Sequence, residues 1–183
     1  MPVHVKAVPV NGLSQFVARE LSPDQLEHVQ ERMGDDARLF TGHLLASDQV
    51  LLEIVNRFTA YAAEAKQEPL KSFGKRAGRF GAELGLKSVY KFIFAVLSID
   101  FVLKRAPFMW SRVYDGGTLV VESAANKATI RLRDFPSHEA GCARATGWFE
   151  LIGQKSGTRD LVCTHSACMA EGARECIWEF AWR

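Results

Sequence analysis

The hydrophobic periodicity of the chain changes from helical to strand-like partway along, and this change most constrains the fold. Apolar residues recur at helical spacing over 51–65, whereas 127–133 alternates between apolar and polar residues, which predicts a strand with one buried and one wet face. A further helix, expected to end near 154, and two last strands at 159–164 and 175–182 follow. Because helices and strands are segregated, the order predicts an α+β domain, with a helical layer packed on an antiparallel sheet of four to five strands.

Local signals refine this outline. Val3–Val10 alternates loosely and predicts an edge strand, because its prolines disfavour a central one. Ser22–Gln25 is typical of a helix start, with a capping box and a proline at the first helical position. Ile99–Phe108 predicts a short helix that breaks around Pro107. Trp110–Tyr114 predicts the first of three short antiparallel strands.

A helix expected to begin at Pro69 contains four glycines, Gly74, Gly78, Gly81 and Gly85. Each lowers helix stability by about 1 kcal/mol relative to alanine, so another interaction must offset them. Close approach of a neighbouring helix is the favoured explanation, and a ligand lying in the groove is the other. The segment is not a phosphate-binding loop, because neither G-x4-G-K-[ST] nor G-x-G-x-x-G occurs.

The chain of 183 residues suits a single domain with a sizeable core. Residues 1–45 are expected to form a helical N-terminal extension, and 46–183 the α+β core. The N-terminus lacks a secretion signal, and the longest apolar segment, Phe92–Leu103, is too short to span a bilayer. A cytoplasmic location is therefore expected, where thiols stay reduced.

The net charge is small, but its distribution along the chain is uneven. Lys and Arg exceed Asp and Glu by 23 − 21 = +2, which implies no overall attraction to nucleic acid or membrane. Acidic residues dominate from Glu20 to Glu68, and basic residues from Lys71 to Arg133. The favoured interpretation is that the two surfaces face each other, within one chain or across a dimer. The alternative is a basic docking patch for an acidic partner.

All four cysteines lie between Cys142 and Cys176, and His165 lies among them. Thiolate and imidazole both suit a tetrahedral zinc ion, and such a cluster in an intracellular protein is more typical of metal or redox chemistry than of disulfides. No C-x2-C pair of a standard zinc ribbon or finger occurs. Composition alone therefore leaves zinc and buried, unpaired thiols as equal alternatives.

Several of these residues resemble a known family. Glu171-Gly-Ala followed by Cys176 and an aromatic strand, with Cys142-x4-Gly147 upstream, resembles the 4-vinyl-reductase-type small-molecule-binding domain, whose fold is similar to that of transport-particle (TRAPP) subunits. The middle of the chain resembles a myxobacterial domain family of similar length with no established activity. The residues that carry this second resemblance are Phe73-Gly-Lys-Arg-Ala-Gly78, Val89-Tyr-Lys91, Phe101-Val-Leu-Lys-Arg-Ala-Pro107 and Trp110-Ser-Arg-Val-Tyr-Asp-Gly116.

The first resemblance implies a zinc site. In its sensor members, three cysteines and a glutamate hold the metal, and Cys142, Cys168 and Cys176 match the cysteine positions. His165 stands where the relatives have glutamate, and histidine is also a good zinc ligand. Cys163 is a spare candidate. A closed set of four ligands implies a structural ion that clips a helix to the turn between the last two strands.

The same resemblance implies an apolar pocket between helices and sheet that holds a small hydrophobic or aromatic molecule, with Tyr90 or Tyr114 as polar anchor. The same residues would equally form a ligand-free core, which is the more typical role of each taken singly. The expected lining is Val89, Tyr90, Phe92, Ile93, Phe101, Trp110, Tyr114, Trp148 and Phe149.

Enzymatic motifs such as G-x-S-x-G, H-E-x-x-H and the Walker loop are absent from the sequence. A reactive pair of Cys163 and His165 lacks an orienting third group. The sequence therefore predicts a non-enzymatic ligand-binding or sensory module with a structural zinc, acting as a homodimer. The competing hypothesis is a dimeric protein-interaction adaptor whose core is closed and holds no ligand.

Overall fold

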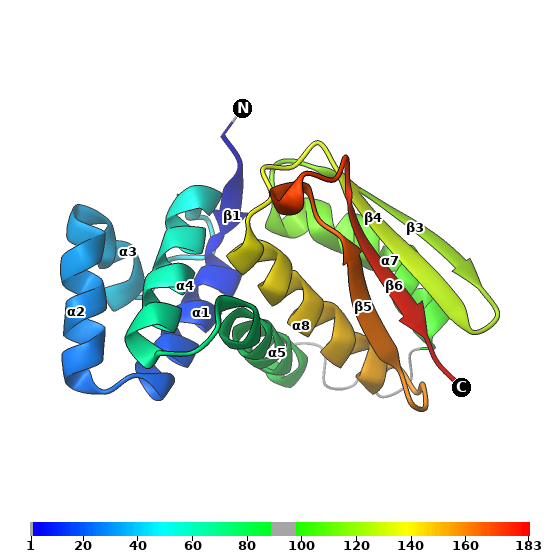
Figure 1. Ribbon diagram of the computed structural model, residues 1–183, viewed down its shortest axis with the longest axis horizontal. Helices are drawn as coiled ribbons and strands as arrows, with labels where there is room; N and C mark the ends of the chain where they lie inside the picture. The colour runs from blue at the N-terminus through cyan, green and yellow to red at the C-terminus, as the bar shows by residue number, and fades with distance from the viewer. Residues whose placement is uncertain (1, 89–97) are drawn as a thin grey trace.

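The computed structural model describes residues 2–88 and 98–183 and confirms the α+β class (Figure 1). The helices are α1 (Ala7–Glu20), α2 (Pro23–Met33), α3 (Arg38–Thr41), α4 (Leu52–Lys66), α5 (Leu70–Ser88), α7 (Ile99–Val113) and α8 (Glu139–Lys155), with 3-10 turns η1 (Gly34–Ala37) and η2 (Met169–Glu171). The strands are β1 (His4–Lys6), β2 (Gln49–Leu51), β3 (Thr118–Ala124), β4 (Lys127–Arg133), β5 (Val162–Ala167) and β6 (Cys176–Ala181).

The N-terminal part is a helical layer closed by a short antiparallel pair, β1 with β2, in which Val5 lies opposite Val50. The predicted strand over 3–10 is correct only for β1, because the chain turns into α1 at Ala7. Pro9 is tolerated there since it lies in the first helical turn, where its missing N–H needs no partner. The apolar faces of α1, α2 and α4 pack into one core.

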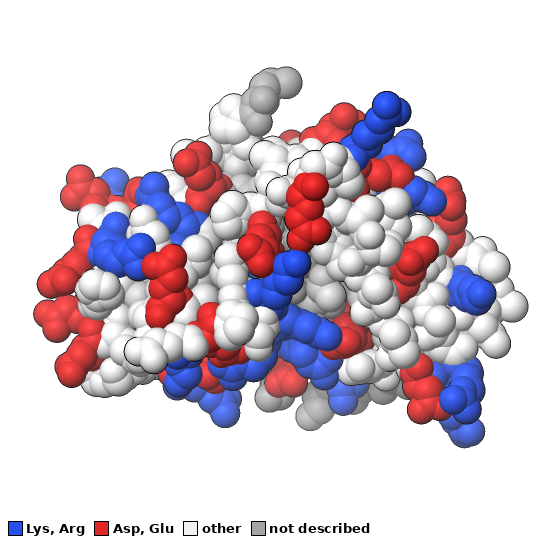
Figure 2. Space-filling model, viewed as in Figure 1, with Lys and Arg blue, Asp and Glu red and all other residues white. Residues whose placement is uncertain are grey.

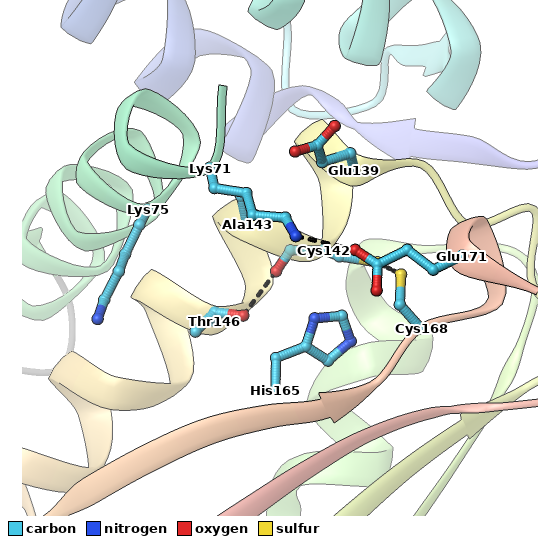
Figure 3. Close-up of a pocket in the computed structure, with 9 residues that line it drawn as sticks. All are labelled: Lys71, Lys75, Glu139, Cys142, Ala143, Thr146, His165, Cys168 and Glu171. Carbon is cyan, nitrogen blue, oxygen red and sulfur yellow. Dashed lines mark hydrogen bonds and ion pairs between the residues drawn. The ribbon is translucent and has the colours of Figure 1, made fainter. Parts of the chain in front are cut away.

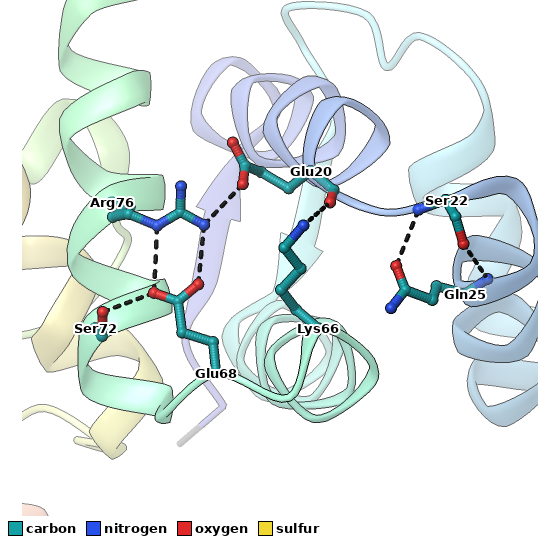
Figure 4. A network of polar contacts seen from close by, with 7 residues as sticks. All are labelled: Glu20, Ser22, Gln25, Lys66, Glu68, Ser72 and Arg76. Atoms are coloured by element: carbon teal, nitrogen blue, oxygen red, sulfur yellow. Dashed lines mark hydrogen bonds and ion pairs between the residues drawn. The ribbon is translucent and has the colours of Figure 1, made fainter.

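The predicted helix start at Ser22 is confirmed as a capping box. The Ser22 hydroxyl accepts the Gln25 backbone N–H at 3.3 Å, and the Gln25 side chain accepts the Ser22 N–H at 3.0 Å (Figure 4). Close by, the Arg76 guanidinium of α5 forms ion pairs with Glu20 at 2.7 Å and Glu68 at 2.9 Å. Part of the charge asymmetry is thus neutralised within one chain.

The C-terminal part is a four-stranded antiparallel sheet in the order β3-β4-β6-β5, at the lower end of the predicted four to five strands. On β4, Ala128, Ile130 and Leu132 are buried in a core shared with α7 and α8. The predicted strand over 110–114 is wrong. Trp110 lies in the last turns of α7, which runs through Pro107 without a break.

The helices α5 and α8 cross closely between the two parts (Figure 1). A Cβ atom added to Gly78 would lie 1.9 Å from the Arg144 carbonyl oxygen, and one added to Gly147 would lie 2.0 Å from the Lys75 carbonyl oxygen. Gly74 faces Ala143 in the same way, at 2.8 Å. Helix packing therefore explains Gly74 and Gly78, whereas a Cβ at Gly81 would meet no described atom within 4 Å.

None of the helices in the part of the chain that the structure describes is both long and apolar enough to cross a membrane. The sequence-based division at residue 45 stays a prediction.

Candidate functional site

Four side chains from three elements converge between α8 and the β5–β6 connection. Cys142 lies in the first turns of α8, His165 on β5, Cys168 just after β5, and Cys176 at the start of β6. Their candidate ligand atoms all lie within 4.8 Å of one another. The sulfur of Cys142 is 3.7 Å from that of Cys176 and 3.6 Å from that of Cys168. The arrangement is compact enough for one ion to contact all four groups.

The local sequence positions each member of this cluster. His138 caps α8 by accepting the Ala140 N–H, which places Cys142 one turn into the helix. The β5–β6 register shifts between His165 and Ala167. The chain then turns through η2, where Gly172 adopts a φ of 93° that favours glycine. The return strand begins at Cys176, opposite Leu132 of β4.

The three clustered thiols differ in their electrostatics. A hydrogen bond with the Cys142 thiol lowers the pKa of Cys176 to about 4, and the nearby His165 imidazole and hydrogen bonds with Ser137 and the Met169 N–H act in the same direction. The same Cys142–Cys176 contact, together with burial, raises the pKa of Cys142. Burial also raises the pKa of Cys168. Within the cluster these contacts favour the thiolate form at Cys176 and disfavour it at Cys142 and Cys168.

His165 supplies an unsatisfied nitrogen at this centre. Its Nε2 atom is buried and has no hydrogen-bond partner among the described residues, although buried polar atoms nearly always have one. The imidazole ring stacks on Trp178, with ring centroids 4.6 Å apart and planes 12° apart. Stacking fixes the ring, so Nε2 is presented as a rigid electron-pair donor.

Cys163 is not part of this cluster. It is buried in the sheet core, and burial, with the nearby Glu150 carboxylate, raises its pKa to about 12. It is therefore a neutral thiol at physiological pH, and the spare ligand candidate from the sequence lies outside the converging set.

A cavity of about 180 Å³ opens beside the cluster (Figure 3). Polar residues that the sequence analysis did not identify line this cavity. Lys71 forms an ion pair with Glu171 at 2.8 Å, and Lys75 pairs with Glu150 at 2.9 Å. Its charged lining is Lys71, Lys75, Glu139 and Glu171, and its other walls are Cys142, Ala143, Thr146, His165 and Cys168. Drug-sized ligand pockets hold about 300–1,000 Å³, so this space suits an ion or a very small molecule.

The predicted aromatic pocket is only partly assembled. Val89, Tyr90, Phe92 and Ile93 lie outside the described residues, and Phe101 is 41% exposed on the outer face of α7. Trp110 and Tyr114 stack with centroids 4.3 Å apart and line a cavity of about 10 Å³. Phe149 packs on Trp178, with Trp148 beside it. Aromatic side chains thus fill the described interior between α7, α8 and the sheet.

Arg144 is a second polar residue that the sequence reasoning missed. From α8 it donates to the Val55 carbonyl at 3.3 Å, to Asn56 Oδ1 at 2.9 Å and to the Thr59 hydroxyl, all on α4. Burial lowers the pKa of its guanidinium. The sequence signal for this role is a single Arg among the small and apolar residues of α8. A buried charge needs polar partners, so such an Arg predicts polar contacts to a neighbouring element.

The fold and its polar cluster define a class of protein: a helical unit joined to an antiparallel sheet, with a Cys3His group at the junction. Solved structures with a similar fold include H-NOX proteins. An H-NOX protein from S. oneidensis in the Fe(II) ligation state has a TM-score of 0.75 and 12% identity, covering 97% of this chain and 96% of that one. An oxygen-binding H-NOX domain related to soluble guanylate cyclases gives 0.72 and 9%, covering 97% and 95%.

A third structure, from work on heme distortion in the H-NOX family, gives a TM-score of 0.72 and 8% identity, covering 97% of this chain and 95% of that one. No protein-family model and no curated protein sequence matches the chain. At these identities the likeness establishes the fold.

Two predictions from the sequence are therefore corrected. The fold is that of H-NOX proteins, so the resemblance to the vinyl-reductase-type domain and the TRAPP-like fold is wrong. That resemblance was carried by short spacings of Cys, Gly and Glu, which different folds can share. The expectation of zinc as cofactor came from the same family and is overturned with it, because the structural neighbours are iron and heme proteins.

Proposed function

We propose that this chain is a non-enzymatic sensory module whose input is an ion or small molecule acting at the Cys142–His165–Cys168–Cys176 cluster. The observation that carries the proposal is the convergence of four ligand atoms within 4.8 Å, one of them a buried imidazole nitrogen without a partner. Thiolate and imidazole together bind soft transition-metal ions in tetrahedral geometry. The proposed ion joins α8 to the β5–β6 turn, so its binding is coupled to the packing of helix on sheet.

A closed set of four ligands leaves no open position for a reacting water, which supports a sensory or structural role. The likeness to H-NOX proteins, several of which are described in defined ligation states, agrees with a domain that responds to ligands. The proposed signal is a shift of α8 relative to the sheet.

Heme, the group that structural neighbours hold, has no histidine beside a described cavity of its size. Heme iron takes an axial His, Cys, Met or Tyr ligand. The five histidines of the chain are His4, His28, His43, His138 and His165. The first four are surface residues or cap α8, and His165 lies in the cluster. The cavities described above hold about 180 and 10 Å³, far below the space of a macrocycle.

The test is a metal census with matched cysteine variants. Elemental analysis of the purified protein for first-row transition metals should find one ion per chain, and Cys142→Ser or Cys176→Ser should lose it. Cys163→Ser is the control, because it removes a buried thiol outside the cluster and should keep the metal. A strong chelator should lower the melting temperature of the wild type and leave that of Cys176→Ser unchanged. Wild-type protein that takes up no metal even on reconstitution would overturn the proposed site.

A protein-interaction adaptor is the second candidate function, favoured by the cavity of only about 10 Å³ between Trp110, Tyr114 and the sheet. Native mass spectrometry of protein purified without added ligand separates the two functions. A retained small molecule in the mass spectrum supports the sensor. A bare, metal-free protein of defined oligomeric mass supports the adaptor.

A further inference from the structure

The outer face of α7 carries an exposed stripe of aromatic and cationic side chains. Phe101 is 41% and Phe108 50% exposed. Arg105 stacks over the Phe101 ring at 5.1 Å from its centroid, and Arg112 over Phe108 at 5.0 Å. Lys104 lies between them on the same face, by helical spacing. We call Phe101, Lys104, Arg105, Phe108 and Arg112 the cationic stripe.

None of the three cations of this stripe has a carboxylate within ion-pair distance among the residues that the structure describes. By contrast, two arginines of α5 are paired: Arg76 with Glu20 and Glu68, and Arg79 with Glu150. Unpaired cations around exposed aromatic rings are typical of contact surfaces, where Arg and aromatic residues are enriched.

A stripe of opposite sign lies on α2. Asp24, Glu27 and Glu31 are exposed at helical spacing, and Asp35 follows in η1. These carboxylates also have no cationic partner in the described part of the chain, whereas the neighbouring Arg32 is paired with Glu64 at 2.5 Å. Acidic side chains gather at this end of the molecule in Figure 2. We call these four residues the acidic stripe.

The two stripes match in length but cannot meet within one molecule. At 1.5 Å per residue, Lys104 to Arg112 spans about 12 Å and Asp24 to Glu31 about 10 Å. They lie at opposite ends of the molecule, since α2 is at one end of the helical layer and α7 packs behind the sheet (Figure 1). Their complementary charges can therefore pair only between molecules.

We propose that the cationic stripe of α7 binds the acidic stripe of α2 in a second copy of this chain. The contact is heterologous, because each molecule offers a different surface to each neighbour, so it builds chains or rings rather than a closed two-fold dimer. Both stripes are exposed and largely ionic, so the association weakens as salt rises.

The experiment uses charge reversal and mixing. Sedimentation velocity of the full chain should show concentration-dependent association at about 20 mM salt that is lost at about 300 mM. Lys104→Glu with Arg105→Glu and Arg112→Glu leaves both stripes acidic. Asp24→Lys with Glu27→Lys and Glu31→Lys leaves both basic. Each triple variant alone should associate at least about tenfold more weakly than wild type, and an equimolar mixture should regain association.

The control reverses three exposed cations that have no ion pair in the described structure and lie away from α7, Lys127→Glu, Arg159→Glu and Arg174→Glu, and it should associate like the wild type. Circular dichroism checks that each variant is folded. A wild type that stays monomeric at low salt overturns the proposal. So does association that survives reversal of the α7 charges. If only the α7 variant loses association and mixing does not restore it, α7 binds a different acidic surface and the α2 assignment is wrong.

Discussion

The hydrophobic cores of the two parts of the molecule are built from different kinds of side chain. The N-terminal core is built from aliphatic and aromatic side chains of α1, α2, α4 and α5, and none of its buried members is a cysteine. The C-terminal core contains all four cysteines, and His165 stacks on its central Trp178. The first interior is mostly apolar, and its few buried polar side chains, Asn11, Asn56 and Thr59, are hydrogen-bonded. The second has three thiols and an unsatisfied imidazole nitrogen at its edge, where we propose that an ion binds.

Between the parts, α5 and α8 cross with their backbones in contact at Gly78 and Gly147, and breaking this crossing should have the largest effect. Gly78→Ala would place a methyl group 1.9 Å from the Arg144 carbonyl oxygen, so the helices must separate. We expect the free energy of unfolding to fall by about 3 kcal/mol, measured by urea denaturation. Gly81→Ala is the matched control and should stabilise by up to about 1 kcal/mol. Equal effects of the two substitutions would show that the crossing does not hold the parts together.

Arg144 joins the same parts through polar contacts, and its replacement should have the next largest effect. Arg144→Lys keeps the charge but cannot reach the Val55 carbonyl, Asn56 and Thr59 together. We expect a loss of about 2 kcal/mol in the free energy of unfolding. The half-exposed Arg79, replaced in the same way, should lose less, because solvent replaces its bonds to Glu150 and Gln154. A smaller loss at Arg144 than at Arg79 would contradict the role of Arg144 as a buried link.

Local patterns in the sequence predict the parts of this structure that depend on neighbours in the chain. The capping box at Ser22 and the alternation on β4 are confirmed because a few adjacent residues determine both. The short run 110–114 is ambiguous, because its few adjacent residues fit either a strand or a helix. It reads as a strand, but Leu103 and Trp110, seven residues apart, bury the same face of α7, and tertiary packing decides for the helix.

In the candidate site, too, the sequence predicts one part and not the other. The four cluster residues could be selected from the sequence because ligand types are few, and they do meet in space. The cavity beside them depends on Lys71 and Lys75 from α5, which the glycine crossing brings against α8. The glycine spacing predicts the close approach of a helix but not that α8 is this helix, and short spacings also assigned the wrong family.

Removing the helix cap at Ser22 tests whether the stability of the N-terminal part can change without changing metal binding at the cluster. Ser22→Ala removes the side-chain acceptor of the Gln25 N–H and should lower the free energy of unfolding by about 1 kcal/mol. The metal content of the protein should not change, because Ser22 lies at the surface of the N-terminal part, away from the cluster. Ser14→Ala serves as control, since its hydroxyl bonds only the Val10 carbonyl within α1, and should be nearly neutral. A change in metal content on replacing Ser22 would show that the two parts are coupled more tightly than their separate cores suggest.

The smallest expected effect lies where β1 meets the turn after α7. Asp115 accepts the His4 backbone N–H at 2.6 Å and contacts its Nδ1 at 2.7 Å. The backbone bond, then the bond to the imidazole, holds the pKa of Asp115 below its ordinary 3.8. A lowered carboxyl pKa stabilises the fold above about pH 4, and this contribution disappears as pH falls through the lowered value. Because the side chain is 43% exposed, we expect Asp115→Asn to lose only about 0.5 kcal/mol at pH 7.

That loss should shrink toward zero in acid denaturation profiles as pH falls through the lowered pKa of Asp115, below which the wild-type carboxylate is protonated as well. Asp160→Asn is the control, because its carboxylate is 68% exposed and lies 3.7 Å from Arg183 at the chain end, and its difference from wild type should be smaller at every pH. A difference for Asp115→Asn that stays constant from pH 7 until the carboxylate is fully protonated would mean that the carboxylate charge does not hold β1 to this turn. The contact between the two parts would then depend on the glycine crossing of α5 and α8 and on Arg144. The two cores would then differ more clearly, one closed mainly by packing and the other by polar groups.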